Sequence, residues 1–207
     1  MDKRYAIFDM DGTLIDSMVY WKQLAEEYLR SKGVKTIPAD ILERIKPMTM
    51  TESGALFRRE FALTGDITGE MNALMDDHYR RDIPLKPGVE QYLRRLQSRG
   101  VKLCVASATA ESLMESCLQR LGVLDCFDFL LSCESVGAGK NRPDVYFEAA
   151  RRLGAAPADC AVYEDALYAA RTAKRAGFYV VGVFDPSADW AGVLEIADET
   201  IKNWEDV

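Results

Sequence analysis

The chain has 207 residues, of which 48% are apolar and 29% charged, a composition typical of ordinary globular proteins and not of disordered or fibrous ones. Its formal net charge of -7 argues against nucleic acid or an anionic membrane as a partner, because both are polyanions. The longest apolar stretches are about seven residues, far below the roughly 20 that span a bilayer. Since no secretion signal is visible either, we expect a cytoplasmic protein.

The cysteines do not have the pattern of a disulfide framework or a zinc site. They are odd in number and never spaced as Cys-x-x-Cys. We expect all five to be reduced, and most of them to be buried as small apolar side chains: Cys104, Cys117, Cys126, Cys133 and Cys160.

The first predicted element is a short apolar run at residues 4–9, which reads as a buried strand ending in a glycine-containing loop. From residue 17 to about residue 83 the apolar spacing becomes helical only. One face of the first helix here carries Trp21, Leu24, Ala25, Tyr28 and Leu29.

Three further helices are expected within this segment, near residues 37–45, 52–63 and 69–79. Thr49 and Glu52 have the spacing of a capping box at the start of the second of these. Tyr20 and Trp21 are expected in the core of this helical part.

After residue 88 helices and strands alternate. The helices are expected at 89–98, 111–121, 144–153 and 166–176, and the strands at 101–106, 127–131, 160–163 and 178–184. Each helix is followed by a glycine, which is a common C-cap signal, and each strand is a nearly continuous apolar run. This rhythm predicts a parallel sheet covered by helices on both faces.

The predicted fold is therefore α/β, with a doubly wound parallel sheet and an inserted all-helical domain. We expect a core domain over residues 1–16 and 84–207 and a helical cap over residues 17–83. An insertion after the first strand leaves the sheet at its carboxyl edge, where such folds bind ligands, so the cap is expected to act as a lid.

Polar side chains gather at the ends of the predicted strands. Asp9 and Asp11 end the first strand, Ser107 ends the second, and a later strand ends in Glu164 and Asp165, while Lys140 opens the loop before a helix. Carboxylates at one edge repel each other unless they bind a cation, and oxygen ligands that leave room for a substrate phosphate favour Mg²⁺. With a hydroxyl and an ammonium group to hold phosphate oxygens, the set predicts phosphoryl transfer.

Each of these residues also has an ordinary structural interpretation. The segment 9–13 could be a polar turn, Ser107 an N-cap, Lys140 a solvated loop lysine and Asp165 the cap of the next helix. Their convergence at one sheet edge favours a site. His78, the only histidine, lies on a polar helix face and is expected at the surface, so a Ser-His-Asp hydrolase is not favoured.

Four ordered motifs at four predicted strand ends resemble those of the haloacid dehalogenase superfamily, in its phosphatase branch with a small helical cap. They are Asp9-Met10-Asp11-Gly12-Thr13-Leu14-Ile15-Asp16-Ser17, Val105-Ala106-Ser107-Ala108-Thr109, Gly139-Lys140-x-x-Pro143-Asp144 and Tyr163-Glu164-Asp165. The resemblance spans nearly the whole chain.

The resemblance implies a two-step hydrolysis of a small phosphorylated metabolite. Asp9 would attack phosphorus and form an aspartyl-phosphate, and Asp11 would act as general acid and then as general base. It also implies Mg²⁺ held by Asp9, the backbone carbonyl of Asp11 and Asp165. Glu164 would be a further ligand or would position a metal-bound water.

The same resemblance assigns the remaining phosphate contacts to the second and third motifs. Ser107, Ala108 and Lys140 would bind the phosphoryl oxygens.

Two further functions are weighed against the phosphatase. One is a sugar phosphomutase of the β-phosphoglucomutase type, but those enzymes carry a His, an Arg and a Lys where this chain has Trp21, Met50 and Ala110. The other is a phospho-accepting signalling module, which lacks both a cap and a second aspartate two residues after the acceptor.

Ala166 and Ala169 replace the usual Ser and Gly after the fourth motif, which concerns helix packing more than chemistry. The sequence does not indicate the substrate or whether the protein is a monomer or a dimer.

Overall fold

The computed structural model describes residues 3–45, 48 and 50–207. They form two compact units, which are described separately: a core unit of Met1–Ser17 with Ile83–Val207, and a helical unit of Met18–Asp82. The expected capping box involves Thr49, which lies outside the described residues.

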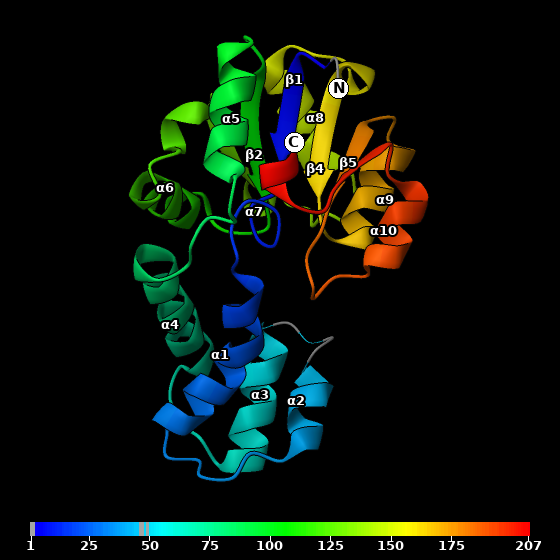
Figure 1. Cartoon of the computed structure of the whole chain (residues 1–207). Helices are drawn as coiled ribbons and strands as arrows, with labels where there is room; N and C mark the ends of the chain where they lie inside the picture. Colours follow the sequence, from blue (N-terminus) through cyan, green and yellow to red (C-terminus); the bar gives the residue numbers. More distant parts are fainter. Residues whose placement is uncertain (1–2, 46–47, 49) are drawn as a thin grey trace. The chain divides into compact units, whose positions relative to one another are not determined.

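The core unit is built on a six-stranded sheet in which every neighbouring pair of strands is parallel (Figure 1). Its order is β3-β2-β1-β4-β5-β6. The strands are β1 (Tyr5–Phe8), β2 (Lys102–Ser107), β3 (Phe129–Ser132), β4 (Cys160–Glu164), β5 (Tyr179–Val183) and β6 (Glu199–Ile201). The parallel α/β sheet predicted from the sequence is therefore confirmed, and its first strand lies in the interior of the sheet.

Helices connect these strands. They are α5 (Val89–Ser98), α6 (Glu111–Arg120), α7 (Cys133–Val136), α8 (Asp144–Leu153), α9 (Leu167–Arg175) and α10 (Trp190–Ile196), with short 3₁₀ turns at Leu124–Cys126, Pro157–Asp159 and Trp204–Asp206. Four of the helices match the expected ranges to within a residue or two. The sequence pattern predicted nothing after residue 184, so β6 and α10 were missed, as was the four-residue α7.

The two faces of the sheet are covered by different layers. On one face Ile7, Cys104 and Val162 form a buried cluster with side chains of α8 and α9. On the other face the rings of Phe8 and Tyr163 stack with centroids 4.1 Å apart, and Trp204 stacks on Tyr163. Residues near the C-terminus thus complete the packing around the first strand.

The helical unit contains α1 (Met18–Ser31), α2 (Ala39–Ile45), α3 (Met50–Phe61) and α4 (Ile67–Arg81). Its core includes Leu24, Tyr28, Phe57 and Met75, all nearly inaccessible to solvent. Burial of such large apolar side chains is the main force that holds short helices together.

Two expectations for the helical unit were wrong. His78 is not a surface residue: its side chain is only 14% exposed, and its two ring nitrogens lie 3.0 Å from Glu27 and 2.9 Å from Asp82. Trp21 was expected in the core but is 36% exposed, and its indole N–H donates to the Tyr79 hydroxyl. Both side chains take part in polar contacts between α1 and α4, His78 with Glu27 and Trp21 with Tyr79.

All five cysteines are free and buried, as expected. Within the part of the chain that the structure describes, no helix has both the length and the apolar character that a membrane crossing requires. The cellular location stays a prediction.

Candidate active site

The chain leaves β1 through a tight loop, residues 9–15, which we call the β1 loop. The carbonyl of Met10 accepts the backbone N–H groups of Thr13, Leu14 and Ile15. Gly12 adopts φ +82°, a left-handed conformation that a residue with a Cβ rarely takes. This local folding places Asp9 directly at the strand end and Asp11 two residues further on.

The loop lies where the strand order of the sheet reverses. β1 pairs with β2 on one side and with β4 on the other. From β2 the sheet continues to β3, whereas from β4 it continues in the opposite direction to β5 and β6. In open parallel sheets the crevice at this point, at the carboxyl ends of the strands, is where ligands bind. Asp9 follows β1, and Glu164 and Asp165 stand at the end of β4, so the two strands present their carboxylates side by side.

Asp9, Glu164 and Asp165 form a buried acidic cluster. Each offers a carboxylate oxygen, and these oxygens lie within 4.8 Å of one another. The three residues are 6%, 1% and 5% exposed. Carboxylates so close together in a dry environment require positive charge nearby.

Lys140 supplies part of that charge. It comes from the loop after α7, is 5% exposed, and its ammonium group donates to Asp9 and, at 2.6 Å, to Glu164. The interpretation of Lys140 as a solvated loop lysine is therefore excluded. Burial alone would lower the pKa of Lys140, but the carboxylates of Asp9 and Glu164 outweigh that effect and raise it.

One ammonium group does not satisfy the whole cluster. Burial raises the pKa of Glu164 to about 8, although Lys140 opposes the shift. Burial and the charge of Asp9 raise the pKa of Asp165 to about 7, and burial also raises the pKa of Asp9. At neutral pH the cluster would hold protons unless a further cation bound there.

Tyr146 of α8 holds Glu164 in place, because its hydroxyl donates to Glu164 Oε1 at 2.7 Å. The other carboxylate oxygen, Glu164 Oε2, is buried and has no hydrogen-bond partner among the described residues. A buried polar oxygen without a partner is costly, so it marks a position where a ligand would bind.

Asp11 belongs to a second group of side chains. Its carboxylate accepts a hydrogen bond from Thr109 Oγ1 at 2.7 Å, while Ser107 Oγ lies 3.5 Å away. Ala108 between them is exposed at the end of β2. The Asp11 side chain is thus directed toward the second motif and not into the acidic cluster.

The structure brings together the residues that the sequence placed at the sheet edge. Lys140 is ion-paired with Asp9 and Glu164, Asp165 lies next to them, and Asp11 joins Ser107. Three further contacts were missed: Tyr146 on Glu164, Thr109 on Asp11, and Thr13, which donates to Asp165 Oδ1 at 3.2 Å. Thr13 and Thr109 stand inside the quoted motifs and could have been found there, whereas Tyr146 has no local signal.

Comparison with known proteins identifies the family of the chain. A family model described as haloacid dehalogenase-like hydrolase matches residues 3–177. The chain is 30% identical to β-phosphoglucomutase of Bacillus subtilis, over 86% of this chain and 81% of that protein. It is 28% identical to hexitol phosphatase B of Escherichia coli K12, over 96% and 91%.

A solved structure is also similar. A Thermotoga maritima protein crystallised as a candidate β-phosphoglucomutase superposes with a TM-score of 0.85 at 25% identity, covering 98% of this chain and 95% of the other. The match extends over both units of the chain.

Proposed function

The chain belongs to the haloacid dehalogenase-like hydrolases, and from this premise we propose that it is a phosphatase that hydrolyses small phosphate monoesters with Asp9 as nucleophile and Mg²⁺ as cofactor. The observation that carries the proposal is the buried cluster of Asp9, Glu164, Asp165 and Lys140 at the point where the strand order reverses. Such a site combines a nucleophile with the positive charge that phosphoryl transfer requires.

The residues fit a magnesium ion. The orphaned Oε2 of Glu164 and the raised pKa values of Glu164 and Asp165 describe an excess of buried negative charge, and hard oxygen donors favour Mg²⁺. Asp9, Asp165 and the backbone carbonyl of Asp11 would hold it, with Glu164 close by. When bound, such an ion neutralises charge on phosphoryl oxygens.

The protein's own residues would divide the reaction between them. Asp9 attacks phosphorus to give an aspartyl-phosphate, and the leaving oxygen takes a proton from Asp11, which then removes one from the attacking water. The Thr109 hydroxyl holds the Asp11 carboxylate in place. Lys140, Ser107 and the backbone at Ala108 stabilise the charge that develops on the phosphoryl group.

The proposal is tested with p-nitrophenyl phosphate and Mg²⁺. Asp9→Asn should lose turnover by several orders of magnitude, because an amide cannot attack phosphorus. Asp159→Asn is the matched control, since Asp159 is exposed in a 3₁₀ turn at the amino end of β4 and should keep the wild-type rate. Near-normal turnover in a folded Asp9→Asn variant would refute the assignment.

A phosphomutase is the second candidate, favoured by the similarity to β-phosphoglucomutase. We propose hydrolysis instead, because a mutase must bind a second phosphate while its aspartyl-phosphate is kept from water. Trp21 and Met50 bring no charge to the helical unit at the positions of the mutase His and Arg, and the Trp21 N–H is already bonded to Tyr79.

Product analysis separates the two candidates. With β-glucose 1-phosphate, free phosphate should form faster than the isomeric sugar phosphate, whether or not glucose 1,6-bisphosphate is added. Faster isomer formation that depends on the bisphosphate would overturn hydrolysis while leaving Asp9 as nucleophile.

A further inference from the structure

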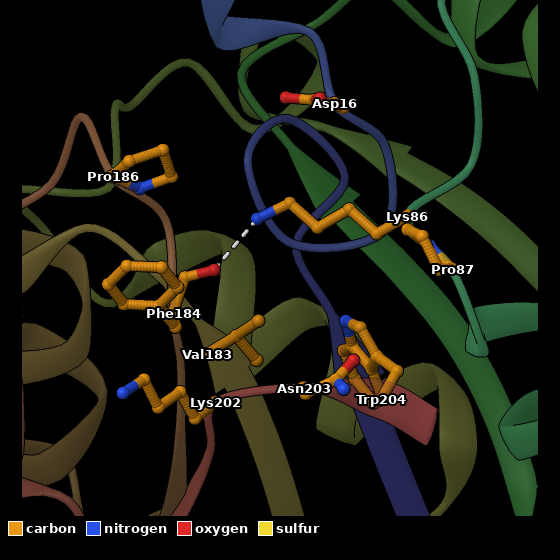
Figure 2. Close-up of a pocket in the computed structure, with 9 residues that line it drawn as sticks. All are labelled: Asp16, Lys86, Pro87, Val183, Phe184, Pro186, Lys202, Asn203 and Trp204. Carbon is orange, nitrogen blue, oxygen red and sulfur yellow. Dashed lines mark hydrogen bonds between the residues drawn. The ribbon is translucent and has the colours of Figure 1, made fainter. Parts of the chain in front are cut away.

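Lys86 stands outside the four motifs, yet its side chain is built into the base of the β1 loop. It lies in the segment where the chain re-enters the core unit, and its side chain is only 12% exposed. The ammonium group donates to the carbonyl of Gly12. It also donates to the carbonyl of Phe184 at 2.9 Å (Figure 2). A lysine ammonium group has three N–H donors, so it can bind several carbonyl oxygens that point toward one place.

A buried carboxylate balances the charge. Asp185 follows β5, is 1% exposed, and its Oδ2 lies 3.0 Å from the Lys86 ammonium. Its other oxygen accepts both the backbone N–H and the hydroxyl of Ser187. Hydrogen bonds from Ser187 and the charge of Lys86 outweigh burial and hold the pKa of Asp185 below its usual value. The lowered pKa favours the Asp185 carboxylate, and the three donor positions of Lys86 Nζ meet three acceptors, the carbonyls of Gly12 and Phe184 and Asp185 Oδ2.

The bond from Lys86 to the Gly12 carbonyl lies next to Asp11, the proposed general acid. Gly12 follows Asp11 directly, and its carbonyl belongs to the Gly12–Thr13 peptide, so the bond from Lys86 restricts the backbone one peptide beyond Asp11. The backbone of Lys86 also donates to the Leu14 carbonyl at 2.9 Å, and Asp16 donates to the Pro84 carbonyl at 3.0 Å. The segment around Lys86 thus holds both the middle and the end of the loop.

We propose that Lys86, neutralised by Asp185, is a positioning residue that sets the β1 loop, and with it Asp11, for the reaction. This inference rests on the proposed function. Displacement of a reacting group by about 1 Å can lower a rate about 10²-fold, so a residue that never touches substrate can control turnover.

The test compares Lys86→Met with Lys202→Met. Lys202 lines the same hollow beside Lys86 (Figure 2) but is exposed. We measure kcat and KM for p-nitrophenyl phosphate, thermal unfolding by circular dichroism, and hydrogen–deuterium exchange in the peptide that covers the loop. Lys86→Met should lower kcat about 10²-fold with little change in KM, and should speed exchange in the loop. Lys202→Met should leave all three unchanged.

A second variant separates positioning from stability. Lys86→Met alone leaves Asp185 as an unpaired buried charge and could unfold the core, whereas Lys86→Met with Asp185→Asn removes both charges. The double variant should recover stability but keep the low kcat and the fast loop exchange. Recovery of kcat together with stability, or wild-type kcat in folded Lys86→Met, would overturn the inference.

The exchange measurement keeps this inference distinct from the proposed function. A wild-type protein without phosphatase activity would refute the phosphatase, while the loop exchange of the variants would still report whether Lys86 holds the loop. Unchanged exchange in both Lys86 variants would refute that role even in an active enzyme.

Discussion

Tyr146 shows how a single hydroxyl outside the motifs can control the acidic cluster. It is fully buried and donates to Glu164 Oε1, the same oxygen that accepts from Lys140. In the proposed magnesium site Tyr146 would hold Glu164 in place, and groups that orient the ligands of a metal typically contribute about 10–100-fold to its affinity.

We therefore expect Tyr146→Phe to raise the Mg²⁺ concentration for half-maximal activity by about 10–100-fold, while kcat at saturating Mg²⁺ changes little. The measurement is a magnesium titration of p-nitrophenyl phosphate hydrolysis. Tyr92→Phe is the matched control, because Tyr92 pairs with the Tyr163 hydroxyl on the other face of the sheet. An unchanged magnesium requirement in Tyr146→Phe would show that this hydroxyl does not support the cluster.

Residues that lie at strand ends could be predicted from the sequence, because parallel strands end at one edge and polar side chains interrupt apolar runs there. Asp9, Ser107 and Asp165 were found in this way. Tyr146 and Lys86 could not be, since a tyrosine within an amphipathic helix and a lysine before Pro87 look like ordinary core and surface residues. Their roles depend on contacts across 18 and 74 residues of chain.

At the scale of elements, α1 and α4 are joined by a histidine with two acidic partners. His78 of α4 lies between Glu27 of α1 and Asp82, and the Tyr20 ring packs 4.9 Å from it. Partial burial by itself would lower the pKa of His78, but its bonds to Asp82 and Glu27 outweigh that effect and raise it above the ordinary value.

The raised pKa of His78 has a defined sign for stability. A group that binds its proton more tightly when folded stabilises the fold fully below its unfolded pKa, about 6.5 for histidine, and loses that contribution as the pH rises through the folded pKa. The free-energy difference between wild type and His78→Gln should thus be largest near pH 6 and shrink toward pH 8. Because Glu27 and Asp82 are partly exposed, we expect a change of about 1 kcal/mol or less.

Urea unfolding followed by circular dichroism at several pH values measures this difference. Glu27→Gln should show a reduced pH dependence of the same sign, since one of the two acceptors is neutral. A difference that grows with pH would contradict the assignment of His78 as a protonated bridge.

The sequence predicted the longer helices and the apolar strands well, and it missed the short elements near the C-terminus. Helices of nine or more residues in the core unit were found because their apolar period and terminal glycines agree. β6 has three residues, two of them exposed, and α10 has seven, so neither has a repeating pattern long enough to recognise. These elements are fixed by packing against β5 and α9, which is information the local sequence does not contain.

At the scale of the whole molecule, the acidic cluster should link metal binding to folding. Its carboxylates come from β1 and β4, strands that are neighbours only in the folded sheet. An ion that binds only the folded protein stabilises it by about 2.7 kcal/mol at a concentration 100-fold above Kd.

We expect MgCl₂ to raise the thermal midpoint of the wild-type core and EDTA to reverse the effect. Asp165→Asn should lose most of the shift, whereas Asp159→Asn should keep it. Differential scanning calorimetry with and without MgCl₂ makes the comparison. An equal magnesium shift in Asp165→Asn would place the bound ion elsewhere.

Fold class and reaction class could be predicted from the sequence because four motifs and a regular alternation of elements point the same way. The substrate could not be predicted, because the acidic cluster would carry out the same chemistry on any phosphate monoester. We expect that choice to depend on side chains of the helical unit, which follow no shared pattern.

The position of β1 between β2 and β4 also bears on how the protein is made. A ribosome adding roughly 5–20 residues per second needs about 8–30 s after Phe8 to deliver β4, and until then one edge of β1 has no strand to pair with. The helical unit is compact within Met18–Asp82, and this whole segment is made during that interval. Until β4 is made, the nascent chain would therefore expose an edge of β1 whose residues Ala6, Ile7 and Phe8 are fully buried in the folded protein. This is the stage of synthesis at which aggregation, or protection by a chaperone, would act on this protein.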